Sequence, residues 1–398
     1  MEKLETQHHQ TYKKIFDYNY KTTLSFFGQW PTQSFFRRNI IRSLIFLNVL
    51  SIFTPKVIKF CESTNDVDVF FECIPMLGLH LLSLSKLITW SINFEKTKTL
   101  LDFMNHDRRH LRLERDLKIM QDRINRDKVI TAAYSTAMFS ILILYLASPA
   151  VPKILDMIKP LNTSRNLIFL YQTEYFVDQH QYYIPILLHA YLTVPFSVSI
   201  IVFFDNVLAM YVTHARGMFS ILRSYLERLH LDTNNKPYTD KNKDLIHKNI
   251  IQCVQMHRRI LEFADIMESL YSYEYIFLLI LNLFVITLTG IVAVIKLDQI
   301  NECLKYCAFC IGGIFHLLYC SYQGQELIEE SERIFTAAYS SEWYTFPPWL
   351  QKLLIPIMMR SVNPSEITAG KLVPISMDTF SIVLKNSMSF FTVLSSMR

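Results

Sequence analysis

Hydroxyl groups and one amine recur at helical spacing near the C-terminus, inside an otherwise apolar stretch. They lie three or four positions apart and are Ser381, Lys385, Ser389, Thr392 and Ser396. Side chains at this spacing share one face of a helix and form a polar stripe along it. Such a stripe does not face lipid: it either packs inside its own subunit or lines an aqueous pore in an oligomer. Val393, beside Thr392, would supply an apolar constriction of the kind that closes a pore by excluding water.

Histidines and cysteines in apolar stretches are the other candidates for chemistry. The histidines are His80, His189 and His316. Ionisable groups at membrane depth are functional candidates, although each imidazole can also simply hydrogen-bond a neighbouring helix. Cys303, Cys307 and Cys310 share one helix face, and a metal site there would need a fourth ligand such as His316. Packing of small apolar thiols explains the cysteines more simply, so we predict no metal site.

Motifs of known enzymes are missing from the sequence. With eight glycines in the whole chain there is no glycine-rich phosphate loop, and there is no G-x-S-x-G elbow. The net charge is +5, and the basic residues adjoin hydrophobic runs rather than forming one patch. We therefore predict no catalytic residues, no cofactor and no nucleic-acid partner.

The elements that position these residues are membrane helices. Of the 398 residues, 51% are hydrophobic and 19% are charged, which is too apolar for an ordinary soluble protein. Spanning a bilayer as a helix takes about 20 mostly apolar residues. Seven windows qualify: 43–60, 67–90, 129–151, 183–211, 273–295, 303–322 and 371–397. The predicted fold is all-α, a single membrane domain of seven helices over 1–398.

The distribution of basic residues predicts the orientation. Lysines and arginines crowd the N-terminal segment and the connections 91–128 and 212–272, and they are sparse in the alternate connections. The positive-inside rule then places the N-terminus in the cytoplasm and the C-terminus outside. The sequon at Asn162 falls in an outside connection, as a glycosylation site must. The cytoplasmic connections repeat apolar residues at helical spacing, so we expect them to form a helical anchor domain between subunits.

Three stretches carry a family resemblance. They are Gly324–Tyr344 (GQELIEESERIFTAAYSSEWY), Trp349–Leu394, and the run DNVLAMYVTHARGMFSILRSYLERL at the cytoplasmic end of span four and beyond it. With them the chain resembles the insect odorant receptors. The resemblance implies a non-selective cation channel that a small volatile ligand opens, embedded in lipid at the plasma membrane of olfactory sensory neuron dendrites. It also implies a heterotetramer with a co-receptor, with the seventh helices lining the pore and Val393 at the gate. Ser396 replaces a co-receptor glutamine, which indicates an odour-specific subunit.

The same resemblance implies a ligand pocket in the outer half of the membrane. Its lining would come from helices two, three, four and six: Met76, Leu79, His80, Ser140, Leu144, Tyr145, His189, Thr193, Phe309 and Gly312. Gly312 stands where the family has an aromatic residue, so we expect a wider pocket there. Taken alone, each of these residues is equally explained by core packing.

Three other classes compete with this interpretation. A G-protein-coupled receptor also has seven helices, but its N-terminus lies outside, against the charge pattern. A gustatory-type receptor is a related channel, and the C-terminal stretches favour the odorant branch. A membrane enzyme or transporter would need a catalytic cluster or an inverted repeat, and the sequence supports neither.

Overall fold

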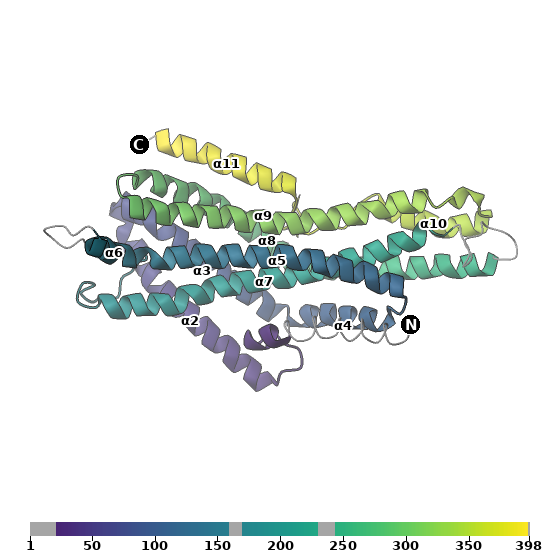
Figure 1. Ribbon diagram of the computed structural model, residues 1–398, viewed down its shortest axis with the longest axis horizontal. Helices are drawn as coiled ribbons and strands as arrows, with labels where there is room; N and C mark the ends of the chain where they lie inside the picture. Colours follow the sequence, from purple (N-terminus) through teal and green to yellow (C-terminus); the bar gives the residue numbers. More distant parts are fainter. Residues whose placement is uncertain (1–20, 159–168, 230–242, 397–398) are drawn as a thin grey trace.

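Long helices lying side by side build the protein (Figure 1). The structure is a computed structural model that describes residues 21–158, 169–229 and 243–396. The helices are α2 (Phe35–Glu62), α3 (Val67–Ile92), α4 (Phe94–His110), α5 (Glu114–Ala147), α6 (Val151–Ile158), α7 (Tyr183–Leu226), α8 (Lys243–Ile295), α9 (Ile300–Tyr339), α10 (Pro348–Ser361) and α11 (Met377–Ser396). Short 3₁₀ turns occupy Ser63–Asn65, Ser148–Ala150 and Trp343–Thr345.

Six of the described helices are long and apolar enough to cross a membrane. They cover Phe35–Glu62, Val69–Ile92, Glu114–Ala150, Tyr183–Leu226, Lys243–Ile295 and Glu302–Thr345. The prediction of long apolar helices is thereby confirmed. Several helices are much longer than a bilayer requires: α8 has 53 residues, about 80 Å at 1.5 Å per residue. α4 and α10 lie beside the long helices toward the right-hand end of the bundle in Figure 1.

The start of the last predicted window differs from the structure. Helix α11 begins at Met377 rather than Lys371, because the chain first makes a tight hairpin. Strand β1 (Thr368–Ala369) pairs antiparallel with β2 (Val373–Pro374), and Gly370 and Lys371 between them have positive φ. Ser272 on α8 fixes this hairpin: its carbonyl accepts from the Gly370 amide at 2.8 Å, and its hydroxyl accepts from the Lys371 amide at 3.1 Å.

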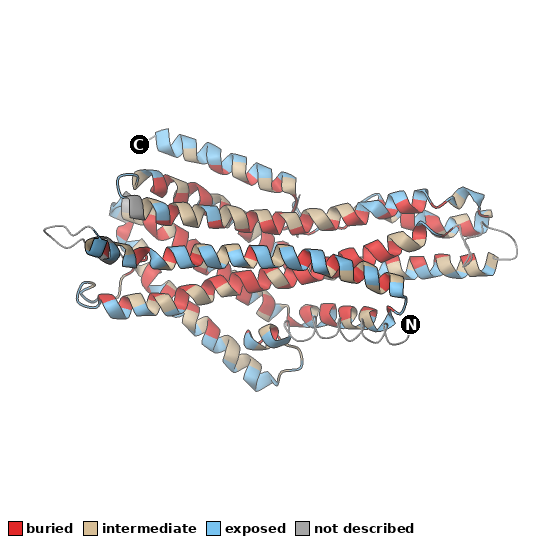
Figure 2. Ribbon diagram, viewed as in Figure 1, coloured by how far each residue is buried: buried red, intermediate tan, exposed pale blue. Residues whose placement is uncertain are grey.

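Helix α7 is the centre of the packing. From Ile200 to Leu222 every residue except Asn206 is buried, so this helix is covered on all sides (Figure 2). A helix that is hydrophobic all round lies either in a protein core or in lipid, and here it lies in the core. α3, α5, α8 and α9 contact α7 and form the walls of the bundle.

Buried ion pairs join the helices at the end of the bundle near α4. Asp107 on α4 accepts hydrogen bonds from His214 on α7, at 3.0 Å, and from Arg259 on α8. Burial alone would raise the pKa of Asp107, but these two partners outweigh it and the net pKa is lowered. Glu330 on α9 accepts from Arg123 on α5 at 2.7 Å and from Ser220 on α7 at 2.8 Å. Five helices are thus fixed to one another outside the apolar windows.

Candidate ligand cavity and pore helix

A cavity lies between α3, α5, α7, α8 and α9, and we call it the five-helix cavity. Its lining residues are Met76, Gly78, Leu79 and Leu82 from α3, Met138, Ile141, Leu142 and Tyr145 from α5, Val194, Val198 and Ile201 from α7, Leu281, Asn282 and Val285 from α8, and Phe309, Gly312, Gly313 and His316 from α9. Its volume is about 90 Å³, measured for the centres of water-sized spheres. One water needs about 10–15 Å³ by this measure, so the space holds roughly six or more water-sized groups.

Glycines on α9 keep this space open. A Cβ built on Gly312 would lie 3.5 Å from Ile141 Cγ2, in ordinary contact, so any longer side chain there would enter the cavity. Phe309, one turn earlier, meets the ring of Tyr145 edge-on at 6.3 Å between ring centroids. The cavity is therefore lined by Gly312 beside the rings of Phe309 and Tyr145, a lining that suits a small apolar molecule.

Two polar side chains lie at the cavity wall, those of Asn282 and His316. Asn282 donates from Nδ2 to the Leu278 carbonyl at 2.9 Å, which leaves its Oδ1 directed away from its own helix. This oxygen would lie 3.9 Å from a Cβ built on Gly313, across the gap to α9. His316 follows Gly313 by one helical turn, so both polar groups meet the same part of the wall.

Behind His316 lies a buried cluster of charges. Lys86 on α3 donates to Asp205 on α7 at 2.8 Å and to Glu274 on α8 at 2.7 Å. The Tyr134 hydroxyl on α5 donates to the second oxygen of Asp205 at 2.7 Å, and His316 Nε2 lies 3.1 Å from that oxygen. The side chains of the three charged residues are at most 3% exposed. One cluster therefore ties together all five helices that line the cavity.

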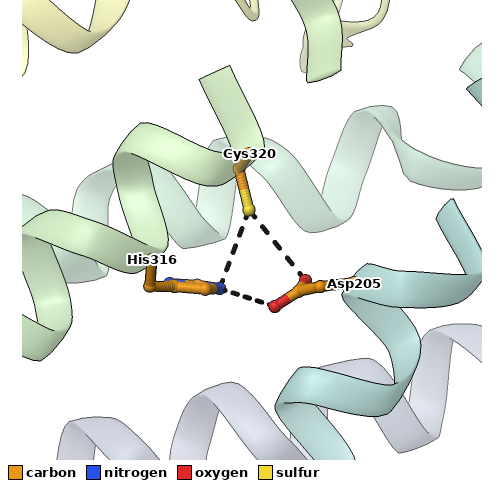
Figure 3. Close-up of side chains that lie close together, drawn as sticks. All are labelled: Asp205, His316 and Cys320. Atoms are coloured by element: carbon orange, nitrogen blue, oxygen red, sulfur yellow. Dashed lines mark hydrogen bonds and ion pairs between the residues drawn. The ribbon is translucent and has the colours of Figure 1, made fainter. Parts of the chain in front are cut away.

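Asp205, His316 and Cys320 place three potential metal ligands within 4.8 Å of one another (Figure 3). Zn²⁺ accepts such a set. Lys86 and Tyr134 already engage both oxygens of Asp205, so ion pairing accounts for the arrangement without a metal. The three cysteines that the sequence offered as metal ligands lie elsewhere. Cys303 Sγ is 4.0 Å from Cys307 Sγ, and Cys310 contacts the Ile286 carbonyl.

Half of the residues predicted for the pocket line the five-helix cavity: Met76, Leu79, Tyr145, Phe309 and Gly312. The other five lie outside it. His80 is buried between Lys56 Nζ at 2.7 Å and Ser197 Oγ at 2.9 Å. His189 contacts Ser51 and the Tyr175 hydroxyl, and the Thr193 hydroxyl donates to the His189 carbonyl. Ser140 and Leu144 lie on the exposed face of α5. A role for these five in ligand binding stays a prediction.

The contribution of α8 to the cavity was missed in the sequence. Asn282 interrupts the most apolar run of the chain, LLILNLFVITL, and that interruption was the available signal. The α7 residues Val194, Val198 and Ile201 gave no signal, because aliphatic residues at helical spacing are typical of any packed helix.

Helix α11 packs on the bundle through a narrow face and leaves its polar stripe outside. Thr379, Val383 and Ser387 are buried, and the Thr287 hydroxyl on α8 donates to the Ser387 carbonyl at 3.3 Å. Val393 and Leu394 are exposed. The polar stripe is also exposed along its whole length, at Ser381, Lys385, Ser389, Thr392 and Ser396. Figure 2 shows α11 largely exposed beside the bundle. In this subunit the stripe is therefore not buried. Asn162, the predicted glycosylation site, lies outside the described residues.

Together, the six long apolar helices and the cavity among them are typical of a helical membrane protein. The chain belongs to the 7tm Odorant receptor family, whose model matches residues 67–388. This confirms the resemblance to insect odorant receptors, which are receptors and not enzymes.

Individual relatives agree with this assignment. The chain is 31% identical over 159 residues to odorant receptor 10 of Aedes albopictus, covering 39% of this chain and 41% of that protein. It is 27% identical over 161 residues to the odorant receptor coreceptor of Ooceraea biroi, covering 39% and 33%. The matched part thus spans about two-fifths or less of these relatives' length. The structure of olfactory receptor OR5 from Machilis hrabei in complex with eugenol has the same fold, with a TM-score of 0.77 at 14% identity over 97% of this chain and 98% of that one.

Proposed function

We propose that this chain is an odour-specific subunit of a ligand-gated, non-selective cation channel. A small, hydrophobic volatile would bind in the five-helix cavity and open the pore. The observation that carries the proposal is the cavity itself, which is apolar, lies among five membrane helices and is widened by Gly312. A small apolar ligand gains affinity there mainly by leaving water. The solved complex of the related OR5 with eugenol supports a ligand of this size.

The proposed topology has seven spans, with α11 as the seventh. Its 20 residues reach about 30 Å, the thickness of a bilayer core. With the N-terminus in the cytoplasm, the C-terminus lies outside. Glycosylation sites engineered at each end test this directly: modification of the C-terminal site alone is expected. Modification at the N-terminus would instead fit a G-protein-coupled receptor.

The pore would form between the α11 helices of several subunits. The support is the exposed stripe on α11. Ser381, Thr392 and Ser396 donate to carbonyls of their own helix, but their oxygens can still accept from water, and an exposed amine such as Lys385 is costly in lipid. Lys385, Ser389, Thr392 and Ser396 would face the pore, and Val393 would close it by excluding water. Lys385 suits a cation pore only in a wide vestibule or when turned aside. The partner would be a co-receptor, completing a heterotetramer at the plasma membrane of olfactory neuron dendrites.

The route from ligand to pore would run through α8. This helix lines the cavity at Asn282 and contacts α11 about two turns later, at Gly290. There Gly290 lies under the ring of Phe391, since a Cβ on Gly290 would be 3.4 Å from Phe391 Cδ2. A ligand that shifts α8 relative to α9 therefore also shifts the support of α11.

Whole-cell recording with a panel of volatiles tests the function. We expect ligand-evoked current when the chain is co-expressed with a co-receptor, and little from this chain alone or the co-receptor alone with the same ligand. Robust current from this chain alone would contradict the need for a partner. Surface expression with no evoked current in the pair would contradict the channel assignment.

A further inference from the structure

The charges around His316 do not balance without a proton. The cluster holds two carboxylates, Asp205 and Glu274, and one ammonium, Lys86. The remaining polar neighbours, the Tyr134 hydroxyl and the Cys320 thiol, are neutral groups in their ordinary forms. An uncompensated buried charge is costly, and the buried imidazole 3.1 Å from Asp205 is the group placed to remove it. His316 as imidazolium makes the cluster neutral.

An imidazolium donates from both ring nitrogens, and Asp205 uses only one of them. Nε2 points to Asp205 Oδ2, with Cys320 Sγ at 3.7 Å (Figure 3). Within the described part of the chain, Nδ1 makes no hydrogen bond, and His316 is one of the residues that line the five-helix cavity. A charged N–H donor is thus available to a molecule in an otherwise apolar space. Hydrogen bonds from charged donors are roughly twice as strong as neutral ones.

Asn282 supplies the complementary acceptor. Its Nδ2 is held by the Leu278 carbonyl, so Oδ1 is left to accept from a ligand hydroxyl. All other lining side chains are aliphatic, aromatic or thioether groups, apart from the Tyr145 hydroxyl, which donates to the Leu170 carbonyl at 2.5 Å.

We infer that the ligands of this receptor are oxygenated volatiles, with a carbonyl or hydroxyl oxygen that accepts a hydrogen bond from His316. An alcohol also donates to Asn282. A hydrocarbon of equal size leaves the donor without a partner, and a protonated amine meets a like charge. The inference rests on the proposed function only in taking the five-helix cavity as the ligand site.

A binding assay on membranes tests this without requiring channel current. Tritiated 2-heptanone is bound to membranes containing this chain with a co-receptor, and membranes with the co-receptor alone give the background. Competition by 1-heptanol, heptane and heptylamine is then compared. We expect heptanol to compete within a few-fold of the ketone, and heptane and heptylamine to be at least tenfold weaker.

Two variants and one control locate the effect. His316→Gln retains an amide donor for Asp205 but removes the charge, so the preference for ketone over heptane should fall at least tenfold. Asn282→Leu should weaken heptanol more than heptanone. Cys320→Ser, which contacts His316 and Asp205 but does not line the cavity, should leave both ratios unchanged. If His316→Gln does not reach the membrane, the Asn282→Leu result and the wild-type competition ratios among the four compounds still decide the question.

The outcomes separate the two proposals. Equal competition by heptane and ketone, or an unchanged ratio in His316→Gln, overturns the inference even where volatiles evoke current. Selective binding with no current in the same cells upholds the inference and overturns the channel. Binding no greater than in background membranes overturns the inference for this cavity.

Discussion

Filling the cavity at Gly312 should change the size of ligand that the receptor accepts. A methyl group at this position makes ordinary contact with Ile141 at 3.5 Å, so Gly312→Ala should fold normally. Helical glycine-to-alanine changes even stabilise by roughly 0.5–1 kcal/mol. Gly312→Leu adds four carbons to a space for roughly six or more water-sized groups, and so fills about half of it. Large volatiles should lose at least tenfold in sensitivity, or about 1.4 kcal/mol, while small ones are retained.

The assay is a concentration–response series for ketones of increasing length, with surface labelling of each variant. Gly290→Ala is the matched control, because its new methyl group would meet Phe391 on α11 and not the cavity. It should leave the order of ligand sizes unchanged. If Gly312→Leu reaches the surface and responds to every ketone as the wild type does, the five-helix cavity is not the ligand site.

Phe309→Ala should shift sensitivity to all volatiles by more than tenfold at normal surface expression, since its ring forms the aromatic wall; lost expression with unchanged sensitivity would assign Phe309 to packing. Val393→Ser, with a co-receptor, should raise ligand-free leak current more than Leu394→Ala, because the two side chains point roughly 100° apart and a polar group wets the constriction; equal leak in both would refute the pore face. Acid should destabilise the detergent-solubilised protein through Asp107. The pKa of this carboxyl is about 3.9 in the unfolded protein and lower in the folded one, so the ionised carboxylate stabilises the fold above pH 3.9. That stabilisation is lost as the pH falls through the lower, folded pKa. Melting temperatures below about pH 4 should therefore decline more steeply for the wild type than for Asp107→Asn, and parallel curves would contradict this.

The helices were predictable because hydropathy is a local property. Each of the first six predicted windows lies within a described helix, apart from the last residues of 129–151, which continue into the 3₁₀ turn and α6. The start of α11 was not predictable in this way. The hairpin before it depends on Ser272, almost a hundred residues earlier, and the apolar residues of KLVPIS gave no sign of that contact.

The candidate site was predictable only in part, from the family resemblance. Met76, Leu79, Tyr145, Phe309 and Gly312 line the cavity as the resemblance implied, whereas His80 does not. The charge cluster behind them escaped prediction, because Lys86 meets partners 119 and 188 residues away and only tertiary packing brings them together. His316 was weighed as a ligand beside Cys310, but its partner is Asp205 on another helix.

We propose that ligand binding in this protein opens an ion pore directly. Excised inside-out patches from cells expressing the chain with a co-receptor test this, in solution free of GTP and ATP. We expect an oxygenated volatile such as 2-heptanone to open a cation current within such patches, and Gly312→Leu to reduce the sensitivity to longer ketones. A response that disappears without nucleotide, in patches that responded before excision, would contradict the claim.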